Sequence, residues 1–501
     1  MSTHPSVVQL KGLAGLDRTV VGGKAWSIDR MLALGIPVPP AFVLTTDVCR
    51  DYYANDRRVD DSVWDAIPAA MAELELITGR HFGAAARPLL VSVRSGAATS
   101  MPGMMDTVLN LGMTDEVERA LAMESGDPGY AADTRRRFLE QFERVVGVPV
   151  PLDPWEQLRL AATAVLQSWN SDRAIHYRRE RGIPDDGGTA VTVQAMVFGN
   201  FDDKSGTGVL FTRNPLTGSA EPYGEWLPRG QGEDVVSGRA NAQHLDDLGA
   251  SMPHVHAELM AAATRLEEDR RDVQDIEFTV EGGTLWLLQT RNAKRTPEAV
   301  VRHAVLHQRQ GLIDTREALD RIGVQDVQAL LTPHLDPAAV ATATRVASGK
   351  PACPGIASGV VVTDADEAED RAARGESVIL ARPTTDPDDV AAMSAVSAVL
   401  TEFGGSTSHA AVVCREMGVP CIVGCGADTV TALAGQFVTV SATTGTVYHG
   451  GLPIITGSES GDPDLALLSD WLRTELGAAA TGSLPELLRL RAHRLNTERT
   501  A

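Results

Sequence analysis

The spacing of hydrophobic and polar residues alternates between helix-like and strand-like along the first 300 residues. Ala25–Leu34 has the spacing of an amphipathic helix, whereas Ala41–Thr46 is a short β-rich run. Residues 113–182 are rich in Arg, Glu and Ala and keep a helical period, and residues 189–296 become β-rich with glycines between the runs. We therefore expect one α+β unit over residues 1–296, with a helical insert at about 113–182.

The remaining sequence predicts a connector, a second domain and a tail. Residues 297–345 are helical and charged, which is typical of a connector. Residues 346–455 hold four strand-like runs separated by helical segments, which predicts a small α/β domain. Residues 456–501 carry two short amphipathic patterns, which predict a helical tail. The four strand-like runs are Gly359–Val362, Val378–Leu380, Ala398–Thr401 and Phe437–Val440.

Composition narrows the class of partner. The chain has 501 residues, enough for about three domains, and 45 basic against 66 acidic residues give a net charge of −21. Such a surface disfavours nucleic acid, so an anionic substrate needs a local cluster of basic groups. No apolar run approaches the roughly 20 residues that span a membrane, and the five scattered cysteines favour a reducing cytoplasm.

One histidine stands at the predicted start of a helix. A strand ending at Thr401 runs into Gly404-Gly405, then Ser406-Thr407-Ser408, and His409 opens a segment rich in Ala and Val. Unpaired N–H groups and the positive end of the helix dipole favour an anion there. A phosphorylated imidazole, with about two negative charges, needs such surroundings. The pattern predicts a phosphohistidine at His409; the alternative is a serine N-cap followed by an ordinary first-turn residue.

The other histidines lack this setting. His303 and His307 lie four residues apart in a helical pattern and could together chelate a metal ion. A solvated helix face explains them more simply, and we adopt that interpretation.

Basic residues beside glycines suit phosphate binding in the first unit. Lys24 follows Gly22-Gly23 at a predicted helix start, where an ammonium can meet a phosphate, although a plain turn explains it as well. Arg94 ends a strand-like run and precedes a Gly- and Ser-rich loop that contains Gly103 and can fold over phosphates. A guanidinium fork fits phosphate oxygens, and the alternative is a structural ion pair. The run containing Met196 suits the wall of an adenine pocket or a core strand equally.

A hairpin is predicted on either side of Gly282-Gly283-Thr284. A three-residue loop pairs Glu281 with Leu285, Glu277 with Gln289 and Asp275 with Arg291. A two-residue loop would shift the register by one and place Gln289 on the apolar face, so we expect three residues. The apolar face then holds Ile276, Phe278, Val280, Trp286 and Leu288.

The polar face of this hairpin carries candidate metal and phosphate ligands. Glu277 and Gln289 form an oxygen-rich pair suited to Mg²⁺, a hard cation. Asp275 and Arg291 can organise phosphates and the surroundings of the metal. The alternative is a polar hairpin face in contact with water.

Together these segments resemble the pyruvate, phosphate dikinase family of PEP-utilising enzymes over nearly the whole chain up to about Gly451. The resemblance implies an ATP-grasp nucleotide-binding domain and a swivelling phosphohistidine domain. The segments that carry it are GGKAWSIDRMLALGIPVPPAFVLTT, SVRSGAATSMPGMMDTVLNLGM, VQAMVFGNFDDKSGTGVLFTRNPLTG, GQGEDVV, DIEFTVEGGTLWLLQTRNAKRT and TEFGGSTSHAAVVCREMGVPC.

The resemblance also implies residue roles. His409 matches the histidine that takes the pyrophosphoryl group of ATP, from which inorganic phosphate removes the outer phosphoryl group as pyrophosphate. Thr407 matches a position that regulatory kinases modify in some members. The nucleotide and Mg²⁺ residues of the family are matched by Lys24, Arg94, Asp275, Glu277, Gln289 and Arg291.

The family continues into a (β/α)8 barrel that binds pyruvate or phosphoenolpyruvate and needs about 250 residues. Only residues 452–501 follow the part of the chain that carries the resemblance. We therefore expect this chain to perform the nucleotide half-reactions, with delivery to pyruvate requiring a separate barrel-containing protein. The alternatives are a dikinase with another small-molecule acceptor, and a phosphocarrier or regulatory protein without turnover.

Overall fold

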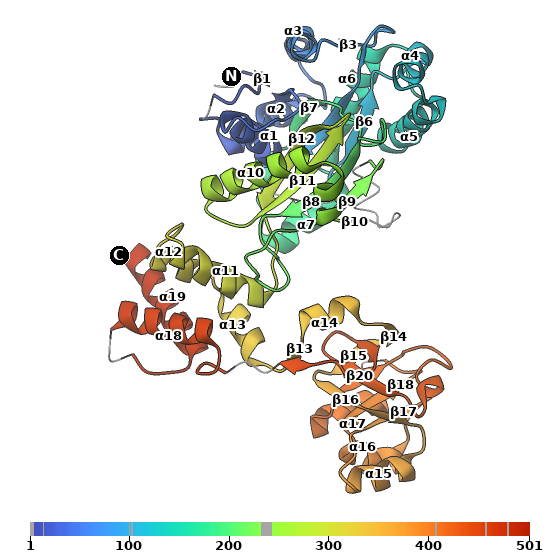
Figure 1. Ribbon diagram of the computed structural model, residues 1–501, viewed down its shortest axis with the longest axis vertical. Coiled ribbons are helices and arrows are strands. Elements are labelled where there is room, and N and C mark those ends of the chain that lie inside the picture. The colour runs from blue at the N-terminus through green and yellow to red at the C-terminus, as the bar shows by residue number, and fades with distance from the viewer. Residues whose placement is uncertain are drawn as a thin grey trace. The chain divides into compact units, whose positions relative to one another are not determined.

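The computed structural model describes residues 5–13, 15–99, 101, 104–231, 243–405, 408–455, 458–477 and 480–500 (Figure 1). Contacts divide the chain into two compact units. The first comprises Met1–Arg213 and Glu221–Lys294, and the second comprises Asn214–Ala220 and Arg295–Ala501. Several sheets and many helices make this a mixed α/β multidomain protein, which confirms the predicted α+β multidomain class. Among the described helices, none is long and apolar enough to cross a membrane.

Two five-stranded antiparallel sheets form the frame of the first unit. The first sheet has the order β1 (Val7–Gln9), β2 (Ala41–Leu44), β7 (Ala190–Ala195), β5 (Val91–Gly96) and β6 (Thr107–Leu111). The second has the order β10 (Gln243–His244), β9 (Tyr223–Pro228), β8 (Gly206–Phe211), β11 (Gln274–Glu281) and β12 (Thr284–Asn292). A further pair, β3 (His81–Phe82) with β4 (Pro88–Leu89), is parallel.

Four helices occupy the stretch in which we expected a helical insert. Their N-caps are Thr114, Asp127, Asp153 and Ser171, whose side chains accept hydrogen bonds from first-turn N–H groups. Three of the four end at a glycine in the left-handed conformation. The helices are α4 (Asp115–Ser125), α5 (Pro128–Val146), α6 (Pro154–Ser168) and α7 (Asp172–Arg181), followed by the turn η1 (Asp185–Gly187).

Two hydrophobic cores hold the first unit together. One joins the first sheet to the insert helices, α2 (Thr46–Ala54) and α3 (Asp61–Thr78). The other joins strands of both sheets to α1 (Arg18–Ala33), α9 (Leu245–Ser251) and α10 (Pro253–Arg270). These cores hold in place β5, β11 and β12, the strands that carry Arg94, Glu277 and Gln289.

The second unit contains a helical cluster made from two distant parts of the sequence. Leucines of the predicted tail pack against the predicted connector, rather than on the domain between them. The core residues include Val301, Leu319, Val327, Leu468 and Leu487. The helices are α11 (Pro297–Arg309), α12 (Thr315–Asp320), α13 (Val324–Leu331), α18 (Pro463–Leu476) and α19 (Leu484–Thr500).

Between these helices lies the domain that carries His409. The chain enters it through β13 (His334–Leu335) and leaves through β22 (Ile454–Ile455), and these two strands pair with each other. Its eight-stranded sheet has the order β14 (Arg345–Ser348), β21 (Thr446–His449), β20 (Phe437–Ser441), β16 (Ile356–Val362), β17 (Val378–Arg382), β18 (Ala398–Thr401), β19 (Cys421–Val423) and β15 (Lys350–Cys353).

Helices cover one face of this sheet. The pairs β16–β17, β17–β18 and β18–β19 are parallel, so the chain crosses between them through helices. The covering helices are α15 (Ala365–Ala373), α16 (Val390–Ala395) and α17 (His409–Met417), as Figure 1 shows. Shorter elements are α14 (Pro337–Thr342), η2 (Pro387–Asp389) and η3 (Thr431–Leu433).

Candidate active site

A pocket of about 590 Å³ opens between the two sheets of the first unit. Its wall from the first sheet includes Arg94 on β5 and Met196 after β7, and its wall from the second includes Glu277 on β11. Helix α5 adds Thr134 and Arg137, so the helical insert closes one side. A cavity of this size with a few convergent polar groups is typical of a small-molecule site.

Lys24 reaches this region because α1 is interrupted. Gly22 has φ +76° inside α1, and a Cβ there would lie 1.9 Å from the carbonyl oxygen of Gly96, so only glycine allows β5 to approach so closely. The Lys24 Nζ atom donates to the carbonyl oxygen of Ser95 at 2.8 Å. Burial, followed by the charge of Arg94, lowers the pKa of Lys24 to about 7. The surroundings of Lys24 therefore carry more positive than negative charge, from Arg94 and Arg291 against Glu277.

Arg94, Glu277 and Gln289 meet on facing strands. Arg94 Nη2 donates to Gln289 Oε1 at 3.4 Å and lies 3.9 Å from Glu277 Oε2. Gln289 Nε2 lies 3.5 Å from Glu277 Oε1. These carboxylate and amide oxygens match the ligand preference of Mg²⁺, which usually takes one or two protein ligands together with phosphates and water. No group of three or more acidic, His or Cys side chains suited to a metal occurs in the described part of the chain, so the phosphates of a substrate would have to complete such a site.

The loop of this hairpin differs from our prediction. Glu281 pairs with Thr284, so the loop has two residues, and Gly282 and Gly283 adopt φ +56° and +79° as the tight turn requires. A β-bulge between Glu277 and Phe278 then shifts the register by one and restores the pairing of Glu277 with Gln289. The prediction of a three-residue loop was wrong because it assumed an unbroken ladder.

The predicted apolar face was also partly wrong. Ile276, Phe278 and Val280 lie in the core as expected, but their partners from β12 are Leu285 and Leu287. Neither Trp286 nor Leu288 belongs to this core of buried residues, and Leu288 lines the pocket.

Asp275 and Arg291 form an ion pair on the same hairpin. Arg291 Nε lies 2.7 Å from Asp275 Oδ2, and the two residues face each other across the ladder. Burial raises the pKa of Asp275 despite this partner. Within the described residues, Asp275 Oδ1 is buried without a hydrogen-bond partner, which leaves an acceptor for a bound group.

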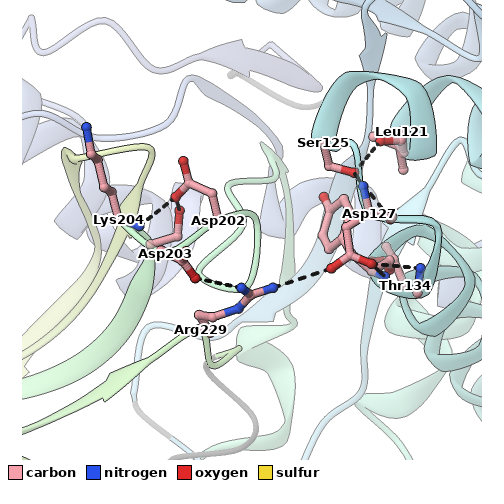
Figure 2. Close-up of polar contacts among 11 residues, drawn as sticks. Leu121, Ser125, Asp127, Thr134, Asp202, Asp203, Lys204 and Arg229 are labelled. Atoms are coloured by element: carbon pink, nitrogen blue, oxygen red, sulfur yellow. Dashed lines mark hydrogen bonds and ion pairs between the residues drawn. The ribbon is translucent and has the colours of Figure 1, made fainter.

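A second ion-pair cluster joins elements that line the pocket. Figure 2 shows Arg229, just after β9, between Asp203 and Asp127. Its Nη1 atom lies 2.7 Å from Asp203 Oδ1 and its Nη2 atom 3.3 Å from Asp127 Oδ2. Asp127 is also the N-cap of α5, the helix that contributes Thr134 to the pocket. Arg229 thereby ties the second sheet to the helical insert.

Two of the predicted site residues lie outside the described residues: Gly103 and Thr407. The same holds for most of the GQGEDVV segment. Met196 is described: its N–H donates to the carbonyl oxygen of Leu90 at 2.9 Å, and the residue lines the pocket.

His409 is the first residue of α17 and is half-buried. Its Nδ1 atom lies 3.1 Å from the hydroxyl oxygen of Thr385, in the loop after β17. Ser408 is the N-cap of α17, but within the described residues its side chain makes no capping hydrogen bond. The N–H groups of the first turn are therefore not used by the side chain of the N-cap residue. Because Nδ1 makes the Thr385 contact, Nε2 is the ring nitrogen left for a phosphoryl group, at a helix start that favours an anion.

The segment before His409 is anchored by residues that the sequence did not reveal. Glu402, 4% exposed, accepts hydrogen bonds from the N–H and hydroxyl of Thr431, and these bonds lower its pKa. Gly404 has φ +119°. The available signal for Glu402 was a carboxylate placed directly after a buried strand. No signal in the sequence identified Thr385, because its contact with His409 joins residues 24 positions apart.

His303 and His307 do not form a solvated face. Both side chains are fully buried in the second unit, with ring centroids 6.3 Å apart. Our interpretation of a solvated helix face was therefore wrong: the ring of His303 lies 3.5 Å from the carbonyl oxygen of Ser219, in the segment Asn214–Ala220 that belongs to this unit.

Comparison with known proteins assigns the two regions that carry these residues. Residues 18–77 and 56–247 match the family model of the pyruvate phosphate dikinase AMP/ATP-binding domain, and residues 374–445 match the mobile domain of PEP-utilising enzymes. The chain is 40% identical to pyruvate, phosphate dikinases of Rhizobium meliloti and Clostridium symbiosum, in each case over 89% of its length. It spans 57% and 58% of the length of these two relatives.

Proposed function

Because the chain belongs to the pyruvate, phosphate dikinase family over its nucleotide-binding and mobile domains, we propose that it catalyses the nucleotide half-reactions of such an enzyme. ATP and inorganic phosphate are converted to AMP and pyrophosphate through His409. The observation that carries the proposal is the hydrogen bond between His409 Nδ1 and Thr385, at the start of a helix whose N-cap side chain is not used.

In the first step, His409 Nε2 attacks the β-phosphorus of ATP. The new N–P bond forms as the bond from the β-phosphorus to the oxygen of the α-phosphate breaks, and AMP leaves. Inorganic phosphate then attacks the outer phosphorus, and pyrophosphate leaves the phosphohistidine behind. Thr385 holds the ring so that the lone pair of Nε2 faces the phosphorus, and the N–H groups of α17 stabilise the added negative charge.

The pocket of the first unit supplies the charges for this transfer. Lys24 and Arg94 offset the negative charge of the phosphates, and Asp275 holds Arg291 in place. Glu277 and Gln289 would hold Mg²⁺, which would supply positive charge to offset that of the phosphates. Met196 contributes to the wall for the base, and Gly103 belongs to the loop proposed to cover the phosphates.

A further part of the proposal concerns the acceptor of the phosphoryl group. We propose that phosphohistidine passes its group to pyruvate only with a pyruvate-binding barrel on a separate polypeptide, and that a kinase acting on Thr407 would regulate it. All five cysteines are free and buried, which fits the proposed cytoplasmic location. The second candidate is a phosphocarrier without turnover, and the release of AMP distinguishes it from the first.

Labelled ATP tests the proposal. With Mg²⁺ and [β-³²P]ATP, the chain should release AMP and keep the label, and His409→Ala should abolish both. His449→Ala is the control, because His449 is an exposed histidine of the same domain. With [γ-³²P]ATP, added phosphate should release the label as pyrophosphate.

Three outcomes would each reject a part of the proposal. Absence of AMP with and without phosphate would support the non-turnover carrier. Label that survives in His409→Ala would place the chemistry on another residue. Formation of phosphoenolpyruvate from added pyruvate by this chain alone would reject the requirement for a separate barrel.

A further inference from the structure

A second pocket of the first unit gathers arginines that the proposed reaction does not use. It has a volume of about 260 Å³ and shares no lining residue with the larger pocket. We call it the arginine pocket; it is lined by Arg57 and Arg58 from the turn between α2 and α3, and by Arg159 from α6, together with Tyr52, Asp61 and Trp64.

The three arginines are exposed, so water solvates their guanidinium groups and leaves them available to a bound anion. Within the described residues, Arg57, Arg58 and Arg159 form no ion pair and donate no side-chain hydrogen bond. Most arginines elsewhere in the first unit do, as Arg136 does with Asp133 and Glu140. In a chain with 66 acidic and 45 basic residues, three arginines that line one surface pocket form a local positive patch, which favours an anion.

The pocket is built on a fixed base. Tyr52 is 1% exposed, and its hydroxyl accepts a hydrogen bond from Gln167 of α6 at 3.0 Å, which ties α2 to the helix that carries Arg159. Arg159 lies over the ring of Trp64, 5.3 Å from its centroid, so two helices restrict the orientation of its guanidinium.

The turn that presents two of the arginines has an unusual backbone. Asp56 and Arg57 both have positive φ, +47° and +59°, which costs free energy in residues other than glycine. Asp60 caps α3, and its Oδ1 atom accepts hydrogen bonds from the N–H and the hydroxyl of Ser62. Asp61 is the one carboxylate in the lining, so three cations face a single anion.

We propose that the arginine pocket binds a small anion bearing a phosphate group, separately from the nucleotide pocket. A guanidinium fork matches two phosphate oxygens, and three such groups match a dianion. The modest volume admits inorganic phosphate, pyrophosphate or a phosphate ester of a small metabolite, and is small for a nucleotide. Helix α6 also packs on β5, the strand of Arg94, so the bound anion lies one helix away from the nucleotide pocket.

Calorimetric titration at constant ionic strength tests the proposal, with inorganic phosphate, pyrophosphate and glycerol 3-phosphate as separate probes and chloride as reference. At least one phosphate probe should bind saturably, and the comparison of the three decides between free phosphate and an ester. Arg58→Gln and Arg159→Gln should each weaken this binding about tenfold, the loss expected for one charged hydrogen bond.

Two variants serve as controls. Arg181→Gln removes the same charge from an arginine that also lies over an aromatic ring, Tyr177, outside the pocket, and should leave binding unchanged. Arg94→Gln weakens any phosphate binding in the nucleotide pocket, so the binding that remains in this variant belongs to the arginine pocket. No saturable binding, binding equal to that of chloride, or binding lost in Arg94→Gln but kept in Arg58→Gln would overturn the proposal. These outcomes are independent of AMP formation, so they do not depend on the proposed function.

Discussion

Glu277 and Gln289 face each other across the β11–β12 hairpin although only two glycines join these strands. The bulge beside Glu277 makes the pairing possible, and it places both side chains beside Arg94. The two oxygens act as a pair only if this facing geometry is kept.

Exchange of these two residues tests them as a Mg²⁺ site. Glu277→Gln should raise the Mg²⁺ concentration needed for ATP binding by about tenfold, because the site loses its charged oxygen. The double variant Glu277→Gln with Gln289→Glu restores the charge on the facing strand and should recover most of the affinity. ATP binding measured against Mg²⁺ concentration checks this, with exposed Glu225→Gln on β9 as control. A double variant no better than the single one would contradict the pair.

The pKa of Lys24 predicts proton uptake on nucleotide binding. With a pKa of about 7, Lys24 is mostly neutral at pH 8, whereas phosphates favour its ammonium form. Binding should therefore take up about one proton at pH 8 and much less at pH 6, and affinity should fall as the pH rises above 7. Calorimetry in buffers of different ionisation enthalpy measures the uptake.

Two variants isolate this effect. Lys24→Arg stays charged and should bind nucleotide without the proton uptake. Lys11→Arg alters a lysine that pairs with Glu73 and should keep the uptake of the original chain. Equal uptake in Lys24→Arg would assign the proton to another group.

Thr385 should set the rate at which His409 is phosphorylated. Thr385→Val keeps the shape of the side chain but removes the hydroxyl, so the ring loses its orientation and the transfer should slow about tenfold. Nucleotide affinity should not change, since Thr385 belongs to the other unit. Rapid-quench measurement of phosphohistidine checks the rate. Thr385→Ser should restore it, and Thr384→Val at the exposed neighbouring position should have no effect.

The tail helices should contribute to the stability of the second unit. Leu472 on α18 is fully buried in the helical cluster, so Leu472→Ala should lower the free energy of unfolding by about 2–5 kcal/mol. Leu490→Ala on α19 is the control, because this side chain is 49% exposed. Urea denaturation followed by circular dichroism measures both. Similar values for the two variants would contradict the role of α18 in this core.

Local patterns predicted the strands around His409 well. The runs Val378–Leu380 and Ala398–Thr401 are continuous and apolar, and they became β17 and β18 in the middle of the sheet. Buried parallel strands carry this signal on both faces, so neighbouring residues suffice to identify them.

The register of the hairpin could not be read in the same way. The tight Gly-Gly turn shifts the register by one residue, and the bulge four residues away shifts it back. The predicted partners of Glu277 and Asp275 were therefore correct although the predicted loop length was wrong. Contacts between distant segments were equally inaccessible. The position of Thr385 beside His409 and the packing of the tail on α11–α13 depend on tertiary structure, for which the sequence holds no periodic signal.

The pairing of β13 with β22 makes the phosphohistidine domain an insertion with adjacent ends. Leu335 and Ile454 are paired residues, so their Cα atoms lie only about 5 Å apart. The segment between them could thus be deleted, and the two ends in the helical cluster joined by a short peptide. Because its ends are adjacent, the same segment could also be inserted into a surface loop of an unrelated protein without distorting the backbone at either end.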